Sequence, residues 1–204
     1  MIRAGILCVP MMDDEAVQAV VQLLQRTIPE LLVLFEQSAA SQRNWIEMCL
    51  VRWCDEDELD LIVTLGGTMP APGPSQLEIV PEATIGVVER LLPGFSEAMR
   101  TNAARQTSLA LLDRSVVGIR GRTLILNLPE GREPALLFLE AVIGLIEPTI
   151  SHLQEDSRRV TLSNVLTPVD EQVEIDQHVD ESHQMSENQF GLDADEFAAF
   201  LRDR

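Results

Sequence analysis

The chain has 204 residues, of which 46% are apolar, and this is enough to form the core of one ordinary domain. Its formal net charge of −18 at pH 7 argues against non-specific nucleic-acid binding, because neutralising phosphates needs a cationic face. All 15 basic residues are arginine, so a P-loop lysine and a Schiff-base lysine are both excluded.

The first third of the chain alternates apolar runs with amphipathic stretches. Residues 2–9, 31–35 and 60–65 are short runs of apolar residues that predict three strands. A helix is predicted to begin near Asp13, and helical spacing of apolar residues predicts another between the second and third strands. The acidic residues that follow this second helix, from Asp55 to Asp60, predict a solvated turn.

The next hundred residues continue the alternation. A helix is predicted from Pro81, because proline is favoured at the first helical position. Its inward residues are expected to be Ile85, Val88, Leu91 and Leu92. Residues 115–129 predict two strands joined by a tight turn near Gly121, and residues 133–153 predict one long helix that Pro148 bends or interrupts.

This alternation predicts the fold class and the division of the chain. Strands that alternate with helices indicate a three-layer α/β/α domain over residues 1–154, with a mostly parallel sheet. Residues 155–204 hold 13 of the 33 acidic residues and predict a largely disordered tail. A short helix is expected near 193–202, and its apolar face either packs on its own domain or docks another protein.

Cysteine spacing and hydropathy indicate the compartment. Cys8, Cys49 and Cys54 match no zinc or redox spacing, so we expect them to pack in the core of a protein kept in a reducing interior. No signal peptide opens the sequence, and no uncharged apolar run is long enough to span a bilayer. The expectation is a soluble cytoplasmic protein that binds neither membrane nor nucleic acid.

The stretch LIVTLGGTM, residues 61–69, ends a predicted buried strand on two glycines. In open α/β sheets, ligands bind beyond the carboxyl ends of the strands. Without side chains, Gly66 and Gly67 let the backbone approach a ligand and point free amides at it, and the helix from Pro81 adds its positive end. The pattern therefore predicts a cradle for a phosphate or another small anion; a simple tight turn is the alternative.

Three segments carry a resemblance to a known family. DELDLIVTLGGT, VPEATIGVVERLLPGFSEAMR and LLDRSVVGIRGRTLILNLP follow one another in the order seen in the MoaB/Mog family of molybdenum-cofactor proteins. The match covers residues 57–150 well and 1–56 loosely. It implies an α/β/α fold, a homotrimer and molybdopterin as the ligand. It also implies transfer of AMP from ATP to the molybdopterin phosphate, with Mg²⁺ and release of pyrophosphate.

The resemblance also implies a set of site residues. Glu78 stands where the family has an aspartate, which makes it the expected metal ligand and a catalytic residue. Ser41 stands at a second catalytic position, where the family has another aspartate; a serine can cap the following helix but supplies no charge. The expected ligand-binding residues are Gly66, Gly67, Thr68, Glu82, Asp113, Arg114, Asn127 and Pro129.

Departures from the family pattern leave two functions open. Met69 replaces a glycine, Asp113 replaces a serine, and the loop over residues 69–80 is longer than usual. One function is a working molybdopterin adenylyltransferase that uses a pterin phosphate and a nucleotide. The other is a domain that binds such a pterin or nucleotide without fast turnover, or that serves as an assembly or scaffold protein.

Overall fold

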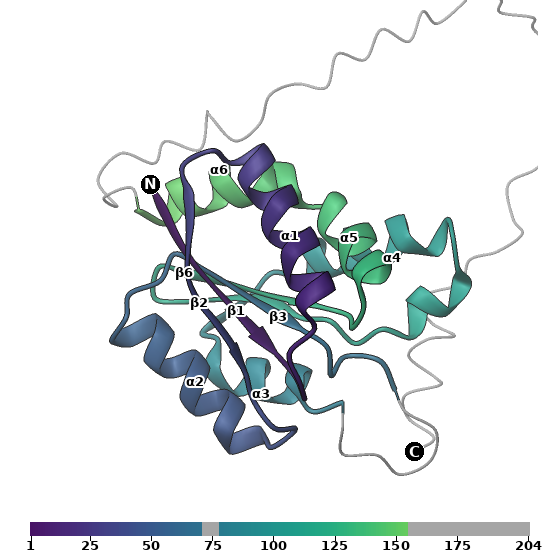
Figure 1. Cartoon of the computed structure of the whole chain (residues 1–204), viewed down its shortest axis with the longest axis horizontal. Coiled ribbons are helices and arrows are strands. Elements are labelled where there is room, and N and C mark those ends of the chain that lie inside the picture. The colour runs from purple at the N-terminus through teal and green to yellow at the C-terminus, as the bar shows by residue number, and fades with distance from the viewer. Residues whose placement is uncertain (71–77, 155–204) are drawn as a thin grey trace, which may run out of the picture. The chain divides into compact units, whose positions relative to one another are not determined.

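The computed structural model describes residues 1–70 and 78–154 and contains one six-stranded sheet with helices on both faces (Figure 1). The strands are β1 (Ile2–Cys8), β2 (Leu31–Ser38), β3 (Leu61–Leu65), β4 (Arg90–Leu91), β5 (Val117–Arg120) and β6 (Thr123–Leu128). The helices are α1 (Asp14–Thr27), α2 (Arg43–Asp55), α3 (Val80–Val87), α4 (Pro93–Ala104), the 3₁₀ helix η1 (Ser108–Leu112), α5 (Arg132–Glu140) and α6 (Ile143–Gln154). The tail and its expected helix lie outside the described residues.

The strands lie in the order β2-β1-β3-β6-β5-β4. The first four run parallel, whereas β5 is antiparallel to β6 and to β4. Cys8 pairs with Leu65 and Leu65 pairs with Leu128, so three carboxyl ends are level at one edge of the sheet. This register brings the loops after β1, β3 and β6 together, and it confirms the predicted mostly parallel sheet.

Two apolar clusters make the three layers. Helices α1, α4, α5 and α6 cover one face of the sheet, and α2 and α3 cover the other (Figure 1). Along β3 the side chains alternate between them: Val63 packs with the first group and Ile62 with the second. Every residue of β3 and β6 is buried, as expected for central strands covered on both faces.

The helix after Pro81 is shorter than predicted. It ends at Val87, and the chain then becomes extended and pairs Arg90 and Leu91 with β5. Ile85 and Leu91 are 52% and 54% exposed, so the expectation that both face inward is wrong. The cause is tertiary: edge pairing with β5 outcompetes continuation of the helix.

The predicted long helix is two helices, α5 and α6, bent by 60°. The break lies at residues 141–142, where the Val142 amide donates to the Leu139 carbonyl at 3.0 Å in a tight turn. Pro148 lies inside α6, so the predicted place of the break is wrong. Within the described residues, no single helix is long and apolar enough to cross a membrane; α5 and α6 meet that test only as a bent pair.

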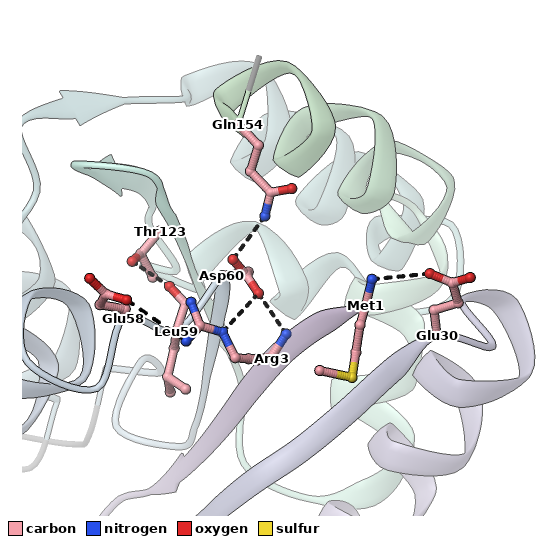
Figure 2. Close-up of polar contacts among 8 residues, drawn as sticks. All are labelled: Met1, Arg3, Glu30, Glu58, Leu59, Asp60, Thr123 and Gln154. Atoms are coloured by element: carbon pink, nitrogen blue, oxygen red, sulfur yellow. Dashed lines mark hydrogen bonds and ion pairs between the residues drawn. The ribbon is translucent and has the colours of Figure 1, made fainter. Parts of the chain in front are cut away.

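The acidic turn before β3 is not fully solvated. Asp60 is 8% exposed, and its carboxylate accepts hydrogen bonds from the Arg3 amide at 2.7 Å and from Gln154 Nε2 at 2.9 Å (Figure 2). Arg3 Nε lies 3.6 Å from the same carboxylate. Asp60 therefore joins β1, β3 and the end of α6 at the edge opposite the glycine turn.

The cysteines behave as packing residues. All three are free thiols; Cys8 is buried, and Cys49 and Cys54 are partly buried on α2. Burial raises the pKa of the Cys49 and Cys54 thiols to about 11. They are therefore protonated at neutral pH, which suits packing better than nucleophilic chemistry.

Candidate functional site

The turn after β3 is built around two glycines in the left-handed region. Gly66 has φ +94° and Gly67 has φ +66°. A Cβ at Gly66 would lie 2.2 Å from the carbonyl oxygen of Val9, so only glycine fits where the β1 loop crosses the end of β3. The Gly66 amide donates to the Leu128 carbonyl at 3.0 Å, which ties the turn to β6.

Two carbonyls of the turn are held by neighbouring segments. The Val80 amide, at the start of α3, donates to the Gly67 carbonyl at 3.3 Å. The Arg114 amide donates to the Thr68 carbonyl at 3.2 Å. Among the described residues, the amides of Gly67 and Thr68 have no acceptor, so each still has a hydrogen bond to give to an anion; Gly67 is partly exposed and Thr68 is fully buried.

Asp113 supports the turn from the segment that follows η1. It is 3% exposed, and its Oδ2 accepts a hydrogen bond from the hydroxyl of Thr68 at 2.6 Å. Its Oδ1 accepts from the Ser115 amide at 2.8 Å and from the Ser115 hydroxyl. Arg100 Nη1 donates to the Ser115 carbonyl at 3.1 Å and fixes this segment against α4.

A charged pair borders the turn on the side of α3. Arg114 Nη2 donates to Glu82 Oε1, and Arg114 Nη1 donates to the Glu78 carbonyl at 3.4 Å. Arg114 is 41% exposed through its side chain, so its charge reaches solvent beside the turn. The second carboxylate oxygen of Glu82 is buried and has no partner within the described part of the chain.

Asn127 and Pro129 are structural in this arrangement. Asn127 is fully buried, and its Nδ2 donates to the hydroxyls of Thr64 and Thr84 at 2.9 Å each. Its Oδ1 accepts from the Val116 amide at 3.2 Å. Asn127 thereby ties β6 to β3 and α3, and Pro129 is buried directly after β6.

Ser41 does not cap α2. The capping position is Gln42, whose side chain makes no capping hydrogen bond. The Ser41 hydroxyl oxygen is buried without a partner among the described residues. The prediction that Ser41 caps this helix is therefore wrong, because the helix begins two residues later, at Arg43.

Described residues line cavities near the carboxyl edge. One of about 280 Å³ adjoins the glycine turn from the β1 side; its lining is Val9, Pro10, Met11, Met12, Asp13, Asp14, Leu65 and Glu130. Another of about 470 Å³ lies between the end of β2 and α2, and Trp45 and Met48 line it together with Arg52. Neither cavity shares a residue with the Thr68–Asp113 network.

The described residues form no preformed metal-binding site. Over residues 1–70 and 78–154, no group of three or more histidine, cysteine, aspartate or glutamate side chains is placed to hold one. Glu78 lies two residues before α3 and Glu82 lies in its first turn; Arg114 bonds the carbonyl of Glu78 and the carboxylate of Glu82. Carboxylates are the side chains that Mg²⁺ commonly takes, one or two at a time, and substrate phosphates and water complete its shell.

The structure brings seven of the predicted residues together around the turn, and it places Asn127 and Pro129 beside it at the end of β6, where the Leu128 carbonyl accepts from the Gly66 amide. Joined around the turn are Gly66, Gly67, Thr68, Glu78, Glu82, Asp113 and Arg114. Asn127 and Pro129 are buried, and no described contact links Ser41 to the turn. The sequence interpretation missed Ser115, although an aspartate whose side chain bonds the amide two residues later is a familiar turn pattern.

Met69, which replaces a glycine of the family pattern, is 41% exposed.

Comparison with known proteins gives concordant results. No model of a protein family matches the chain. A molybdopterin adenylyltransferase of Helicobacter pylori is 34% identical over 153 residues, covering 75% of this chain and 85% of that protein. The molybdopterin adenylyltransferase of Escherichia coli is 34% identical over 117 residues, covering 57% of this chain and 58% of that protein.

The fold agrees with this similarity. The structure of the molybdopterin biosynthesis enzyme MoaB from Thermus thermophilus matches with a TM-score of 0.65 and 35% identity. The match covers 75% of this chain and 96% of that one. Given sequence identity over most of both chains and a shared fold, the protein belongs to the molybdopterin adenylyltransferase family.

Proposed function

We propose that this protein transfers AMP from ATP to the terminal phosphate of molybdopterin. In this reaction an oxygen of the molybdopterin phosphate attacks the α-phosphorus of ATP. The bond from that phosphorus to the oxygen that bridges the α- and β-phosphates breaks, and pyrophosphate leaves. The observation that carries the proposal is the turn after β3, where the Gly67 and Thr68 amides lie without acceptors among the described residues, beside the exposed guanidinium of Arg114. The names of the similar proteins supply the substrates.

The chain's own groups have distinct tasks in this proposal. The Gly67 and Thr68 amides hold phosphate oxygens without any lysine, and the α3 N-terminus adds the positive end of its dipole. Arg114 neutralises charge that develops on the transferred phosphate. It is held ready by Glu82 and the Glu78 carbonyl, so little reorganisation is needed when a substrate binds.

Magnesium fits the start of α3. Glu78 would provide one carboxylate, and the buried unpartnered oxygen of Glu82 would provide a second. When bound, Mg²⁺ would neutralise the negative charge of the substrate phosphates. The homotrimer and the nucleotide are further parts of the proposal and rest on the family resemblance, and the proposed cytoplasmic location rests on the cysteine spacing and the hydropathy of the sequence.

A second candidate is a binding or assembly protein of the same family without fast turnover. The observation that favours it is Ser41, which stands at a family aspartate position and whose hydroxyl has no partner among the described residues. Loss of one charge-positioning carboxylate would remove several kcal/mol of transition-state stabilisation.

One assay separates the two candidates. ATP, Mg²⁺ and molybdopterin are mixed with the protein, and pyrophosphate release is followed together with ligand-dependent thermal stabilisation. We expect pyrophosphate from the wild type and at least a roughly tenfold lower rate from Glu82→Gln, because one charge-positioning group is lost. The control is Glu97→Gln, an exposed carboxylate of α4. Stabilisation without pyrophosphate would support the binding protein instead.

A further inference from the structure

The buried carboxylate of Asp113 is unexpected beside a turn that is proposed to hold phosphate. A buried negative charge there would repel an anionic ligand unless its oxygens are occupied by the protein. Both are occupied: Oδ2 accepts from Thr68 at 2.6 Å, and Oδ1 accepts from the Ser115 amide at 2.8 Å and from its hydroxyl. At 3% exposure, Asp113 is aimed into the protein and not toward a ligand.

The hydrogen bond between Thr68 and Asp113 determines which groups of Thr68 can donate to a ligand. A threonine hydroxyl has one proton. Because that proton is donated to Asp113, the Thr68 oxygen keeps only lone pairs and cannot donate to a phosphate. Thr68 is also fully buried. The side chain therefore cannot donate to an anionic ligand, and the group of Thr68 that can donate is its main-chain amide, which has no acceptor among the described residues.

The backbone of Thr68 is held on both sides. Its carbonyl accepts from the Arg114 amide at 3.2 Å, and the preceding Gly67 carbonyl accepts from the Val80 amide at 3.3 Å. In a planar trans peptide, the amide points opposite to the carbonyl. Fixing the Gly67 carbonyl toward α3 therefore fixes the Thr68 amide in the opposite direction.

We infer that Asp113 is a positioning residue that sets the glycine turn, and that it is not a ligand for the substrate. Its carboxylate holds the side chain of Thr68 while the amides of Val80 and Arg114 hold the Gly67 and Thr68 carbonyls, so the peptide that carries the Thr68 amide keeps one orientation. This inference rests on the proposed role of the turn as a phosphate cradle. It replaces the expectation that Asp113 touches the ligand.

The variant Asp113→Asn tests it, because the change keeps the shape but removes the negative charge and one of the two acceptor oxygens that hold Thr68 and Ser115. Binding of Mg²⁺–ATP is measured by calorimetry below the unfolding temperature of each variant. A lost hydrogen bond to a charged group predicts affinity that is about 10- to 100-fold weaker. Thr68→Val should give the same loss and the double variant no more, while Thr68→Ser, which keeps the hydroxyl, should bind like wild type.

A control and a ligand-free measurement complete the test. Asp55→Asn changes an exposed carboxylate that pairs with Arg120, and it should leave ATP affinity unchanged. In NMR spectra without ligand, the Thr68 hydroxyl proton should exchange slowly in the wild type, and Asp113→Asn should speed exchange of the Val80 amide, which donates to the Gly67 carbonyl.

The outcomes are distinct. Unchanged affinity and unchanged exchange of the Val80 amide in Asp113→Asn would overturn the positioning role, even if the variant is less stable. A wild type that binds neither ATP nor molybdopterin would contradict the proposed function instead. In that case the exchange of the Val80 amide decides the positioning role alone: faster exchange in the variant supports it, and unchanged exchange rejects it.

Discussion

Single residues at the carboxyl edge serve the turn more than they serve a ligand directly. Gly66 is glycine because the Val9 carbonyl fills the place of a side chain. Asp113 and Asn127 are polar residues whose hydrogen-bonding groups are used within the protein. The groups that remain available to a ligand are main-chain amides of the turn, and Arg114 lies beside them. A sequence motif of glycines and polar residues therefore contains both residues that bind the ligand and residues that only position them.

Substituting Gly66 should be costly before any ligand is present. Gly66→Ala requires a side chain at φ +94° and a contact of 2.2 Å with the Val9 oxygen, so we expect at least about 2 kcal/mol of lost stability in urea unfolding. Gly94→Ala is the control, because nothing lies within 4 Å of a Cβ built there. Equal stability of the two variants would contradict the packing account.

The two thiols on α2 should make stability fall at alkaline pH. Burial raises the folded-state pKa of Cys49 and Cys54 from 9.0 to about 11, which favours the protonated form in the folded state. The stabilisation is therefore complete below pH 9 and is lost as pH rises from 9 to about 11. Unfolding midpoints measured across this window should fall less steeply in Cys49→Ala/Cys54→Ala. An identical slope in both proteins would contradict the prediction.

At the scale of elements, the sequence predicted the strands best and the helix ends least well. Apolar runs gave β1, β3 and β6 within one or two residues, because a strand covered on both faces has few alternatives. The end of α3 depends on edge pairing of Arg90 and Leu91 with β5, which no local pattern encodes. The 60° bend between α5 and α6 lies at residues 141–142 and not at Pro148, which is inside α6.

The candidate site was predictable only in part, for a similar reason. The glycines and Arg114 follow from the motif, whereas the partners of Asp113 depend on how η1 and its following segment meet the turn. Ser115 and Thr68 lie 47 residues apart in the sequence numbering and yet bond to one carboxylate. Long-range polar networks of this kind have no periodic signature in a single sequence.

We expect Asp60 to stabilise the fold at the edge of the sheet opposite the glycine turn. Asp60→Ala leaves the Arg3 amide and Gln154 without their shared acceptor, so we expect a loss of about 2 kcal/mol in urea unfolding. The control is Glu30→Ala, a carboxylate that is 79% exposed and pairs with the N-terminus, for which we expect less than about 1 kcal/mol. A comparable small effect for both would show that the Asp60 contacts contribute little.

At the scale of the whole molecule, the charge of the chain limits how it recognises substrates. A net charge of −18 repels nucleotides and pterin phosphates at long range, so capture must rely on local donors. Arg114 is held beside the glycine turn by its ion pair with Glu82, and its side chain is 41% exposed.

Assembly is the remaining whole-molecule expectation. The family resemblance predicts a homotrimer, so sedimentation equilibrium should give three times the chain mass of 22.7 kDa. Exposed leucines on η1, at positions 109, 111 and 112, are 61%, 61% and 56% exposed in the single chain. A species at the mass of one chain across micromolar concentrations would contradict the trimer.

The central proposal for this protein is that main-chain amides at the end of β3 bind the substrate phosphate. The most direct measurement is amide-resolved NMR of the wild type as Mg²⁺–ATP and molybdopterin are added. We predict shifts and slowed exchange at the Gly67 and Thr68 amides, in step with binding measured by calorimetry. Saturating binding with both amides unchanged would contradict the claim.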